Sequence, residues 1–452
     1  MNDTVAAVAT PPGRGGVGII RISGPKSYDI CQTIIGCVPS PRTAHYAAFS
    51  GADKCRIDEG LAIFFKQPHS FTGEDVLELH GHGGPVVIDM LLRRVLSLGA
   101  RLARAGEFSE RAFLNNKMDL VQAEAVAQLI SASTEQAAVA AMRSLQGEFS
   151  DVITKLVEAL IRLRLYVEAA IDFPEEEINF LADSHIHDSL HGLLSQVAAL
   201  CVRAQQGVLL DEGVNVVIAG RPNAGKSTLL NRLTGQDTAI VTPIAGTTRD
   251  IVKAQINLDG VVLNVIDTAG LRDTDDIIEQ AGIRRALQAI ELAALVLVVV
   301  DGVGEQNFDP RVLYPELMQQ VNSQAKVLVV CNKIDRANMQ PAVKSNPEYS
   351  VVYISAKTGA GIDLLRAQIK EIIGMTAGVA DSGMFLARRR HLDALARAEQ
   401  CLLIGKHNLE IAAGELLAEE LKQAQLALSE ITGQFTSDDL LGRIFSEFCI
   451  GK

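Results

Sequence analysis

The sequence predicts a multidomain α/β protein: an N-terminal α+β domain, a helical domain interrupted in sequence, and a parallel α/β domain inserted into it. Three observations predict this organisation. Residues 1–117 alternate strand-like and helix-like patterns. Apolar seams at helical spacing occur both before and after the central segment. Within that segment, each of several polar motifs follows a short β-branched or apolar run, as expected at the ends of parallel strands.

The composition limits the classes of protein that fit. A chain of 452 residues is long enough for roughly three domains of ordinary size. It is 48% hydrophobic but only 4% aromatic and has no tryptophan, which indicates aliphatic cores. The net charge of −12 argues against a protein that coats nucleic acid by bulk charge, although a local basic patch stays possible.

Cysteine usage and hydropathy indicate a cytoplasmic protein. The 7 cysteines are scattered and form no C-x-x-C pair, which predicts a reducing compartment without a zinc site or disulfide framework. The first eight residues have no basic region, so we expect no signal peptide. The apolar run at 292–300 is too short to span a membrane, and we expect no membrane partner.

The N-terminal segment is expected to be α+β. Gly13-x-Gly15-x-x-Gly18 resembles a dinucleotide fingerprint, but that motif must open a helix and a strand-like run follows instead, so we reject it. The residues around it are expected to form a turn-rich loop. The predicted strands and helix of this segment are 19–22, 61–65, 76–79 and 86–98.

Titratable residues cluster around the strand predicted at 76–79. His80 and His82 flank a glycine after it; they could begin a metal site, but no third ligand is apparent, and we expect loop roles. Glu78 lies within an otherwise apolar strand. Its carboxylate either pairs with a cation or accepts two hydrogen bonds from the N–H edge of a ligand.

Two apolar helical seams are predicted to pack together. The first runs from Ile153 to Ala170 and is followed by Phe173-Pro174, where we expect the helix to stop. The second runs from Leu417 to Ile431. Neither stretch has enough partners of its own to close a core, so we expect one helical domain with the central segment inserted, although two separate helical appendages would also fit.

The central segment carries a phosphate-binding loop. Gly220-Arg-Pro-Asn-Ala-Gly-Lys-Ser227 matches G-x-x-x-x-G-K-[S/T] between a strand-like run and a helix-like one. The glycines let backbone N–H groups surround a β-phosphate, and the following helix adds its positive dipole end. Lys226 reaches the β- and γ-phosphates, and we place it among the catalytic groups; the Ser227 hydroxyl ligates Mg²⁺. The same loop supplies Asn223, Ala224, Gly225 and Thr228.

Two further motifs are predicted to sense the γ-phosphate. Gly246-Thr-Thr-Arg-Asp250 falls at a switch position, where Thr248 can close over Mg²⁺ and the γ-phosphate. Asp267-Thr-Ala-Gly270 follows a predicted strand, which puts Asp267 near the metal and lets the Gly270 N–H reach the γ-phosphate. Between them, Asp259-Gly260 predicts a hairpin turn.

The last two motifs predict recognition of guanine. In Asn332-Lys333-Ile334-Asp335, the Asp335 carboxylate matches the N1–H and 2-amino donors of guanine. Ser355-Ala356-Lys357 follows another strand-like run, and its backbone can meet the guanine O6. Five motifs in this order predict GTP binding. Leu271 stands where related enzymes often carry a water-orienting glutamine, so another acid, a cation or a partner must handle the water.

With these motifs, the chain resembles the MnmE (TrmE) family of bacterial tRNA-modification GTPases over essentially its whole length. The resemblance also includes Ala9–Gly18, Ala170–Glu177 and the terminal Phe448-Cys-Ile-Gly-Lys452. It implies a tetrahydrofolate-binding and dimerisation domain at 1–117, helical parts at 118–212 and 375–452, and a Ras-like G domain at 213–374.

The resemblance also implies an activity and its partners. The protein would be a homodimer and a K⁺-stimulated GTPase. With a flavin-dependent partner, MnmG, it would add an aminomethyl or carboxymethylaminomethyl group to C5 of the wobble uridine of certain tRNAs. The one-carbon donor would be 5,10-methylene- or 5-formyl-tetrahydrofolate, and the flavin would belong to the partner.

Several site residues follow from the resemblance alone. The family's folate contacts fall on Arg21, Glu78, Lys117 and Lys452, which favours a ligand role for Glu78. Its water-orienting acid falls on Glu279. Cys449 in the tail is either a nucleophile or a small buried apolar residue, and we favour the second interpretation. The ligands of a K⁺ ion beside the phosphates would be Asn223, Thr242, Ile244 and Thr247.

Two alternatives come from other classes of function. A ribosome-assembly GTPase switch without covalent chemistry would share the central domain, but such proteins append an RNA-binding module, and we find no KH-type Gly-x-x-Gly in a basic context. Direct tRNA binding by Arg388-Arg-Arg390 is the other, for which a solvated helix face is the simpler explanation.

Overall fold

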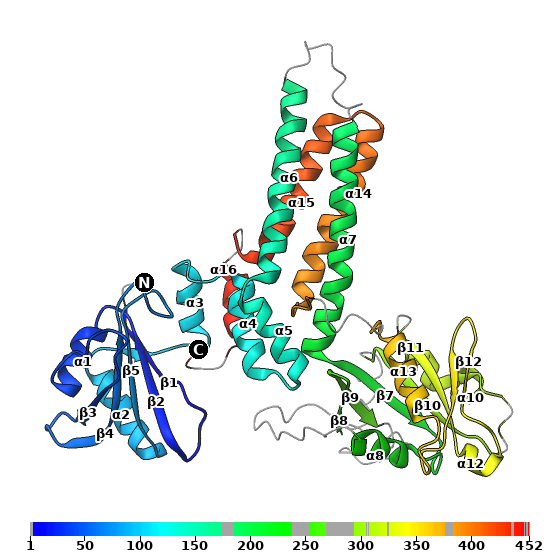
Figure 1. Cartoon of the computed structure of the whole chain (residues 1–452), viewed down its shortest axis with the longest axis horizontal. Coiled ribbons are helices and arrows are strands. Elements are labelled where there is room, and N and C mark those ends of the chain that lie inside the picture. Colours follow the sequence, from blue (N-terminus) through cyan, green and yellow to red (C-terminus); the bar gives the residue numbers. More distant parts are fainter. Residues whose placement is uncertain are drawn as a thin grey trace. The chain divides into compact units, whose positions relative to one another are not determined.

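The structure is a computed structural model, and its contacts group the chain into two compact units (Figure 1). The first unit is Met1–Ile130, Ser144–Ser195 and Arg397–Lys452, and the second is Ser131–Arg143 and Gln196–Ala396. The described residues are 3–172, 184–236, 254–267, 293–303, 305, 307–322, 325–375, 383–434, 438–446, 448 and 451.

A six-stranded sheet forms the N-terminal part of the first unit, in the order β3-β4-β5-β2-β1-β6. Its neighbours pair antiparallel except β1 with β6, which confirms the α+β prediction. The register places Arg21 of β2 directly opposite Glu78 of β5. The strands are β1 (Val5–Val8), β2 (Gly15–Ser23), β3 (His45–Ser50), β4 (Arg56–Phe65), β5 (Val76–Gly83) and β6 (Arg101–Leu102).

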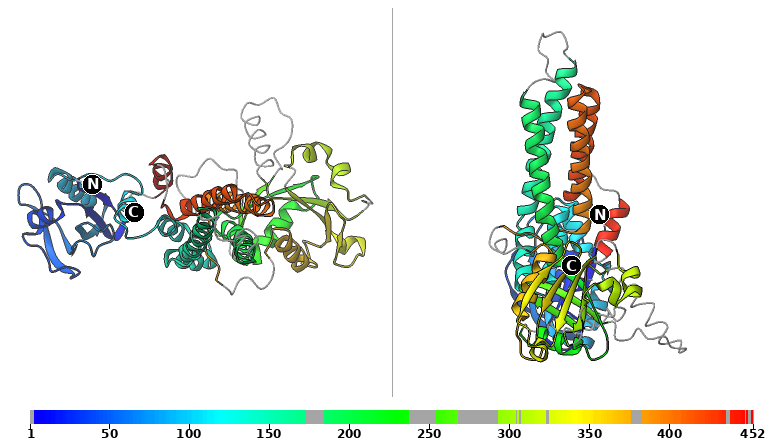
Figure 2. Two further views of the ribbon diagram at one scale, coloured as in Figure 1. Left: turned by 90° about the horizontal axis from the view of Figure 1, so that it is seen from above. Right: turned by 90° about the vertical axis from the view of Figure 1, so that its right-hand side faces the viewer.

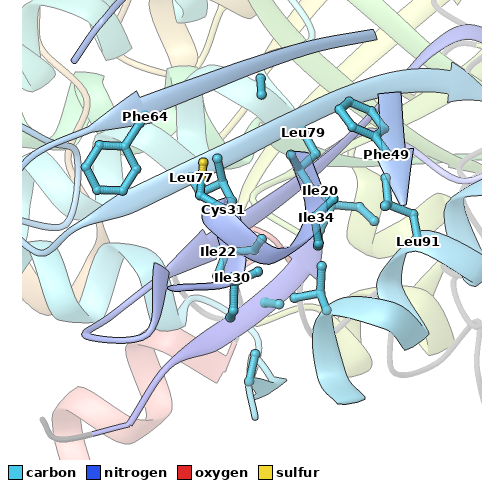
Figure 3. Packing of buried hydrophobic residues seen from close by; sticks show 14 of the residues in the cluster. Ile20, Ile22, Ile30, Cys31, Ile34, Phe49, Phe64, Leu77, Leu79 and Leu91 are labelled. Atoms are coloured by element: carbon cyan, nitrogen blue, oxygen red, sulfur yellow. The ribbon is translucent and has the colours of Figure 1, made fainter. Parts of the chain in front are cut away.

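One face of this sheet is buried under α1 (Ser27–Ile35) and α2 (Pro85–Ser97). Alternate residues of β2 and β5 point into this core, as the period of two requires. Figure 3 shows strand side chains packing against helix side chains in this core. The labelled strand residues are Ile20, Ile22, Phe49, Phe64, Leu77 and Leu79, and the labelled helix residues are Ile30, Cys31, Ile34 and Leu91. The opposite face therefore carries the intervening residues, among them Arg21, Glu78 and His80.

The rest of the first unit is helical, and its two predicted seams do pack together. The seam residues lie on α6 (Glu148–Asp172) and α15 (Gly414–Thr432), which run side by side in Figure 1 and in both views of Figure 2. Arg164 of α6 donates a hydrogen bond to Gln425 of α15 at 2.7 Å. The other helices of this unit are α3 (Glu107–Leu114), α4 (Leu120–Ser131) and α16 (Asp438–Ser446).

Two helices, α7 (Ser184–Glu212) and α14 (Arg389–Glu410), contain residues of both units. Among the described residues, α7 is long and apolar enough to cross a membrane by length and composition. Core helices of soluble proteins pass the same test.

The second unit is built on a mostly parallel seven-stranded sheet in the order β12-β13-β11-β10-β7-β9-β8. Only the pairs at its two edges, β12 with β13 and β8 with β9, are antiparallel. The apolar runs in the sequence form its central strands, as expected for a sheet buried on both faces. The strands are β7 (Val214–Gly220), β8 (Ala254–Leu258), β9 (Val261–Asp267), β10 (Leu295–Asp301), β11 (Lys326–Asn332), β12 (Ala342–Ser345) and β13 (Ser350–Tyr353).

The predicted turn at Asp259-Gly260 joins β8 to β9 and confirms the hairpin. The Thr134 hydroxyl donates to the Gly260 carbonyl at 3.0 Å and accepts from the N–H of Ala137, so it also caps the following helix. The helices of this unit are α5 (Glu135–Leu145), α8 (Lys226–Gln236), α10 (Pro310–Leu313), α11 (Pro315–Gln320), α12 (Ile334–Ala337) and α13 (Ile362–Ile372), of which α5 ends two residues beyond it.

Two predictions in the N-terminal segment are wrong. The stretch expected as a loop already forms β2 from Gly15, with a bulge between Gly15 and Gly18. A Cβ on Gly83, its partner, would lie 2.6 Å from the Gly15 carbonyl oxygen, so this pairing depends on glycine and leaves no side-chain pattern. His80 and His82 are strand residues of β5 rather than loop residues.

Candidate functional site

The phosphate-binding loop connects β7 to α8 in the strand–loop–helix context that the motif requires. Gly225 and Asn223 have φ angles of 99° and 62°, which turn the loop sharply before the helix begins at Lys226. The Lys226 Nζ donates to the carbonyls of Gly220 and Arg221 at 2.7 and 3.0 Å. The ammonium group is thus held over the loop, where a phosphate would lie.

Asn332 ties this loop to the guanine-reading motif. Its side chain is buried, and its Nδ2 donates to the Ala224 carbonyl at 2.9 Å. Its Oδ1 accepts from the backbone N–H groups of Lys333 and Ala356, at 2.8 and 2.9 Å. One amide therefore joins three of the five predicted motifs, and every polar atom of it has a partner.

The Asp335 carboxylate, which the sequence predicts to read the base, is oriented by a neighbouring hydroxyl. Ser355 Oγ donates to Asp335 Oδ1 at 2.6 Å and accepts from the Thr358 N–H at 3.2 Å. Asp335 is exposed at the start of α12, so the carboxylate keeps room for a ligand's donors. Lys357, next in the motif, is also exposed.

Sequence reasoning missed Asp301 at this site. It ends β10 directly beside Asn332 of β11, and its Oδ2 accepts from Lys333 Nζ at 2.7 Å. Its Oδ1 accepts from the Val303 N–H, and these hydrogen bonds outweigh partial burial to hold the pKa of Asp301 below its usual value. The available signal was an acid closing a fully apolar strand next to the guanine motif.

The close approach of Asn332 leads to a prediction for Gly225. A Cβ at Gly225 would lie 2.1 Å from Asn332 Nδ2. We expect Gly225→Ala to displace the buried amide and to weaken GTP binding by about tenfold or more, as measured by titration of a fluorescent GTP analogue.

Gly374→Ala is the matched control for backbone strain. Gly374 has a similar φ of 81°, but a Cβ there would meet nothing within 4 Å. It should cost about 1 kcal/mol of stability and leave GTP affinity unchanged. Equal GTP affinity in the Gly225 variant and wild type would show that Asn332 does not connect the two motifs.

The remaining switch residues are only partly described. Asp267 ends β9 opposite Ile218 of β7, two residues before the phosphate loop. Ser227 and Thr228 are exposed in the first turn of α8. The residues predicted to close over the γ-phosphate and K⁺ lie outside the described residues: Thr242, Ile244, Thr247, Thr248, Gly270 and Glu279.

A second polar cluster lies on the partly open face of the N-terminal sheet. Glu78 Oε1 accepts from Arg21 Nε at 2.8 Å, and Oε2 lies 3.1 Å from His80 Nε2. Although burial raises the pKa of Glu78, the hydrogen bond from His80 and the charge of Arg21 outweigh it and keep that pKa below its usual value. The Arg21 guanidinium stands over the rings of Phe71 and Phe108, at 5.7 and 5.8 Å.

The C-terminal end reaches this cluster through Gly451. Arg21 Nη1 donates to the Gly451 carbonyl at 3.3 Å, and a Cβ on Gly451 would lie 2.5 Å from the Val8 carbonyl oxygen. Cys449 and Lys452 lie outside the described residues. Lys117 Nζ donates to the Pro68 carbonyl at 3.0 Å, on the loop between β4 and β5, rather than to Glu78.

The mostly parallel sheet, the phosphate loop before α8 and the guanine motif after β11 together define a P-loop GTPase. The sequence-family model of the MnmE helical domain matches residues 120–449, and that of the GTP-binding protein TrmE N-terminus matches residues 4–117. The chain belongs to the family of the tRNA modification GTPase MnmE.

Similar proteins cover the whole chain. The tRNA modification GTPase MnmE of Saccharophagus degradans is 55% identical over 453 residues, which span 100% of this chain and 99% of that protein. The MnmE of Chromohalobacter salexigens is 57% identical over 451 residues, covering 100% and 98%. A solved structure of Aquifex aeolicus Era is 29% identical, covers 41% of this chain and 65% of its own, and has a TM-score of 0.26.

Proposed function

We propose that this chain is a K⁺-stimulated GTPase that works with a flavin-dependent partner of the MnmG class. Together they add an aminomethyl or carboxymethylaminomethyl group to C5 of the wobble uridine of certain tRNAs. The one-carbon unit comes from 5,10-methylene- or 5-formyl-tetrahydrofolate. The observation that carries the proposal is that one chain of this family holds both a linked phosphate-and-guanine site and the Arg21–Glu78 pair.

The nucleotide and its metal fit the residues of the second unit. Asn332 connects the phosphate loop to the base motif, so Lys226 and Asp335 can act on the two ends of one GTP molecule. Ser227, with its exposed position in the first turn of α8, would hold Mg²⁺ together with Thr248. When bound, Mg²⁺ and K⁺ neutralise charge that develops between the β- and γ-phosphates.

The K⁺ site is proposed at Asn223, with Thr242, Ile244 and Thr247 from the switch. Asn223 is exposed in this loop, and its φ of 62° is in the left-handed region. An amide oxygen is a suitable ligand for a hard cation. Leu271, after the Asp-Thr-Ala-Gly motif, has no polar atom to orient water, so Glu279 is proposed for that role.

Folate binding is proposed at the Arg21–Glu78 cluster. A pterin ring presents an N–H and an amino group on one edge, and a partly buried carboxylate is the complementary acceptor. Lys117 would extend the site along the loop between β4 and β5, and Lys452 would add a cation from the tail. Its backbone neighbour Gly451 is buried and accepts a hydrogen bond from Arg21.

A homodimer through the N-terminal domain is proposed as well. A hollow of ≈ 1120 Å³ opens beside the loop after β1 and the start of α2. Exposed apolar side chains lie in and next to it: Val17 is 59% exposed, Val86 72% and Leu102 57%. Side chains of this type at such exposure are typical of a surface that a second subunit covers.

The test is a reconstitution in which GTP turnover and tRNA mass are followed in KCl and in NaCl at equal ionic strength. With the flavin partner, folate donor and tRNA present, we expect turnover about tenfold or more faster in KCl. We also expect a mass gain at the wobble uridine that disappears when any one component is omitted.

Matched asparagine variants test the cation site. Asn223→Ala should abolish the advantage of KCl, whereas Asn231→Ala, exposed on α8, should keep it. Equal slow rates in both salts would overturn the cation site, and unmodified tRNA in the complete mixture would overturn the proposed chemistry.

A further inference from the structure

The hydrogen bonds of Glu78 point to a role for His80, and this inference rests on the proposed folate function. His80 lies two residues after Glu78 on β5, so both side chains are on the same face. Their neighbours on β4 are Ile63, opposite Glu78, and Leu61, opposite His80. The side chains of Glu78 and His80 are 14% and 22% exposed, so a ligand can reach both.

The chemistry of the carboxylate fixes the direction of its bond to His80. An ionised carboxylate can only accept hydrogen bonds, and the low pKa of Glu78 keeps it ionised at neutral pH. Therefore Nε2 of His80 carries the proton and donates to Oε2 across the 3.1 Å. This holds for the Nε2–H tautomer as well as for the imidazolium form.

The Glu78 carboxylate has acceptor positions left for a ligand. A carboxylate offers about four acceptor positions, two on each oxygen. Among the described residues, Arg21 occupies one on Oε1 and His80 occupies one on Oε2. One position remains on each oxygen, which is the set that a two-donor edge such as N–H beside NH₂ requires.

We propose that His80 is a positioning residue of the folate site. Its Nε2–H fixes Oε2, as Arg21 fixes Oε1, so that the carboxylate presents one acceptor on each oxygen to the pterin edge. Without this donor the terminal torsion of a glutamate is broad, and the carboxylate turns about it. Leu61, which is 40% exposed, and Ile63 supply an apolar surface for the flat ring.

The experiment measures binding of 5-formyl-tetrahydrofolate to the full chain by calorimetry. We expect His80→Leu to weaken binding about tenfold, the effect of losing one hydrogen bond to a charged group. His80→Gln keeps an N–H donor and should restore affinity to within about threefold. His82→Leu is the control, because His82 is mostly exposed and its Nδ1 bonds Asp58 at 2.8 Å instead.

A second ligand separates positioning from a structural effect. A folate analogue without the 2-amino group lacks the second donor, so we expect His80→Leu to weaken its binding less than about twofold. Equal weakening of both ligands would overturn the proposal, because His80 would then act only through the fold. Undiminished affinity of the His80→Leu variant for 5-formyl-tetrahydrofolate would overturn it too. If wild type binds no folate, the folate function itself fails, together with this inference.

Discussion

Replacing Asp335 with asparagine is expected to lower the affinity for GTP at least about a hundredfold and to raise the affinity for xanthosine triphosphate. In the proposed site the carboxylate would accept from N1–H and the 2-amino group of guanine, whereas an amide would lose one of these charged hydrogen bonds and oppose the other donor. Xanthine has a carbonyl in place of the amino group, to which the asparagine amide can donate. Titration of the variant and of wild type with each nucleotide measures the change in their relative affinities.

The asparagine variant should fold normally, since its side-chain oxygen can still accept from Ser355 Oγ, as Asp335 Oδ1 does at 2.6 Å. Asp363→Asn is the matched control, because Asp363 is an exposed acid in the first turn of α13. If Asp335→Asn binds GTP as tightly as wild type, Asp335 does not read the base.

Replacing Arg111 with methionine is expected to destabilise the N-terminal domain by about 3–5 kcal/mol, because it breaks a buried network of charges. The Arg111 side chain is 1% exposed; its Nη2 bonds Glu107 at 3.1 Å and Asp3 at 2.8 Å, and its Nη1 bonds Glu74 at 3.0 Å. Glu107 is fully buried, and without Arg111 its charged partners are Arg101 and Arg104, which are 44% and 60% exposed.

Hydrogen–deuterium exchange in the full chain measures the loss of stability within the N-terminal domain. A local measurement is needed because a protein of several domains does not unfold in one step. The amides of β1 and α3 should exchange roughly a hundredfold or more faster in the variant. Arg93→Met removes an exposed pair with Asp89 and should cost under about 1 kcal/mol. Similar protection in the two variants would show that the buried network contributes no more than a surface pair.

The stability that this network contributes depends on pH through the ionisation of Glu107. Burial disfavours the charged form, but hydrogen bonds from Arg101, Arg104 and Arg111 prevail and lower the pKa of Glu107 to about 2. A depressed pKa means that the contribution to stability is complete above the ordinary value of 4.5 and is lost as the pH falls towards 2. Protection of β1 and α3 should therefore fall over that range, and less steeply in the Arg111 variant.

Local patterns in the sequence were enough to predict most of the described strands, several helices and the class of protein. Periodicity gave α6 and α15, apolar runs gave the central strands of the second sheet, and glycine and asparagine motifs placed the phosphate loop and hairpin. These signals depend on neighbouring residues, whose propensities act within a few positions. The edge strand β12 was missed because it is four residues long and mostly exposed, and the start of β2 because its glycines leave no alternating side-chain pattern.

The sequence by itself therefore determined which chemical groups this protein carries, namely the nucleotide-binding motifs in one part and a carboxylate within an apolar strand in another. Only the tertiary structure decided their partners. Arg21 meets Glu78 across 57 positions, Asn332 meets Ala224 across 108, and Arg21 meets the tail across 430. Likewise, Lys333 is bound to Asp301 and His80 to Glu78. Such contacts depend on strand order and on packing between distant segments, which no local pattern of residues specifies.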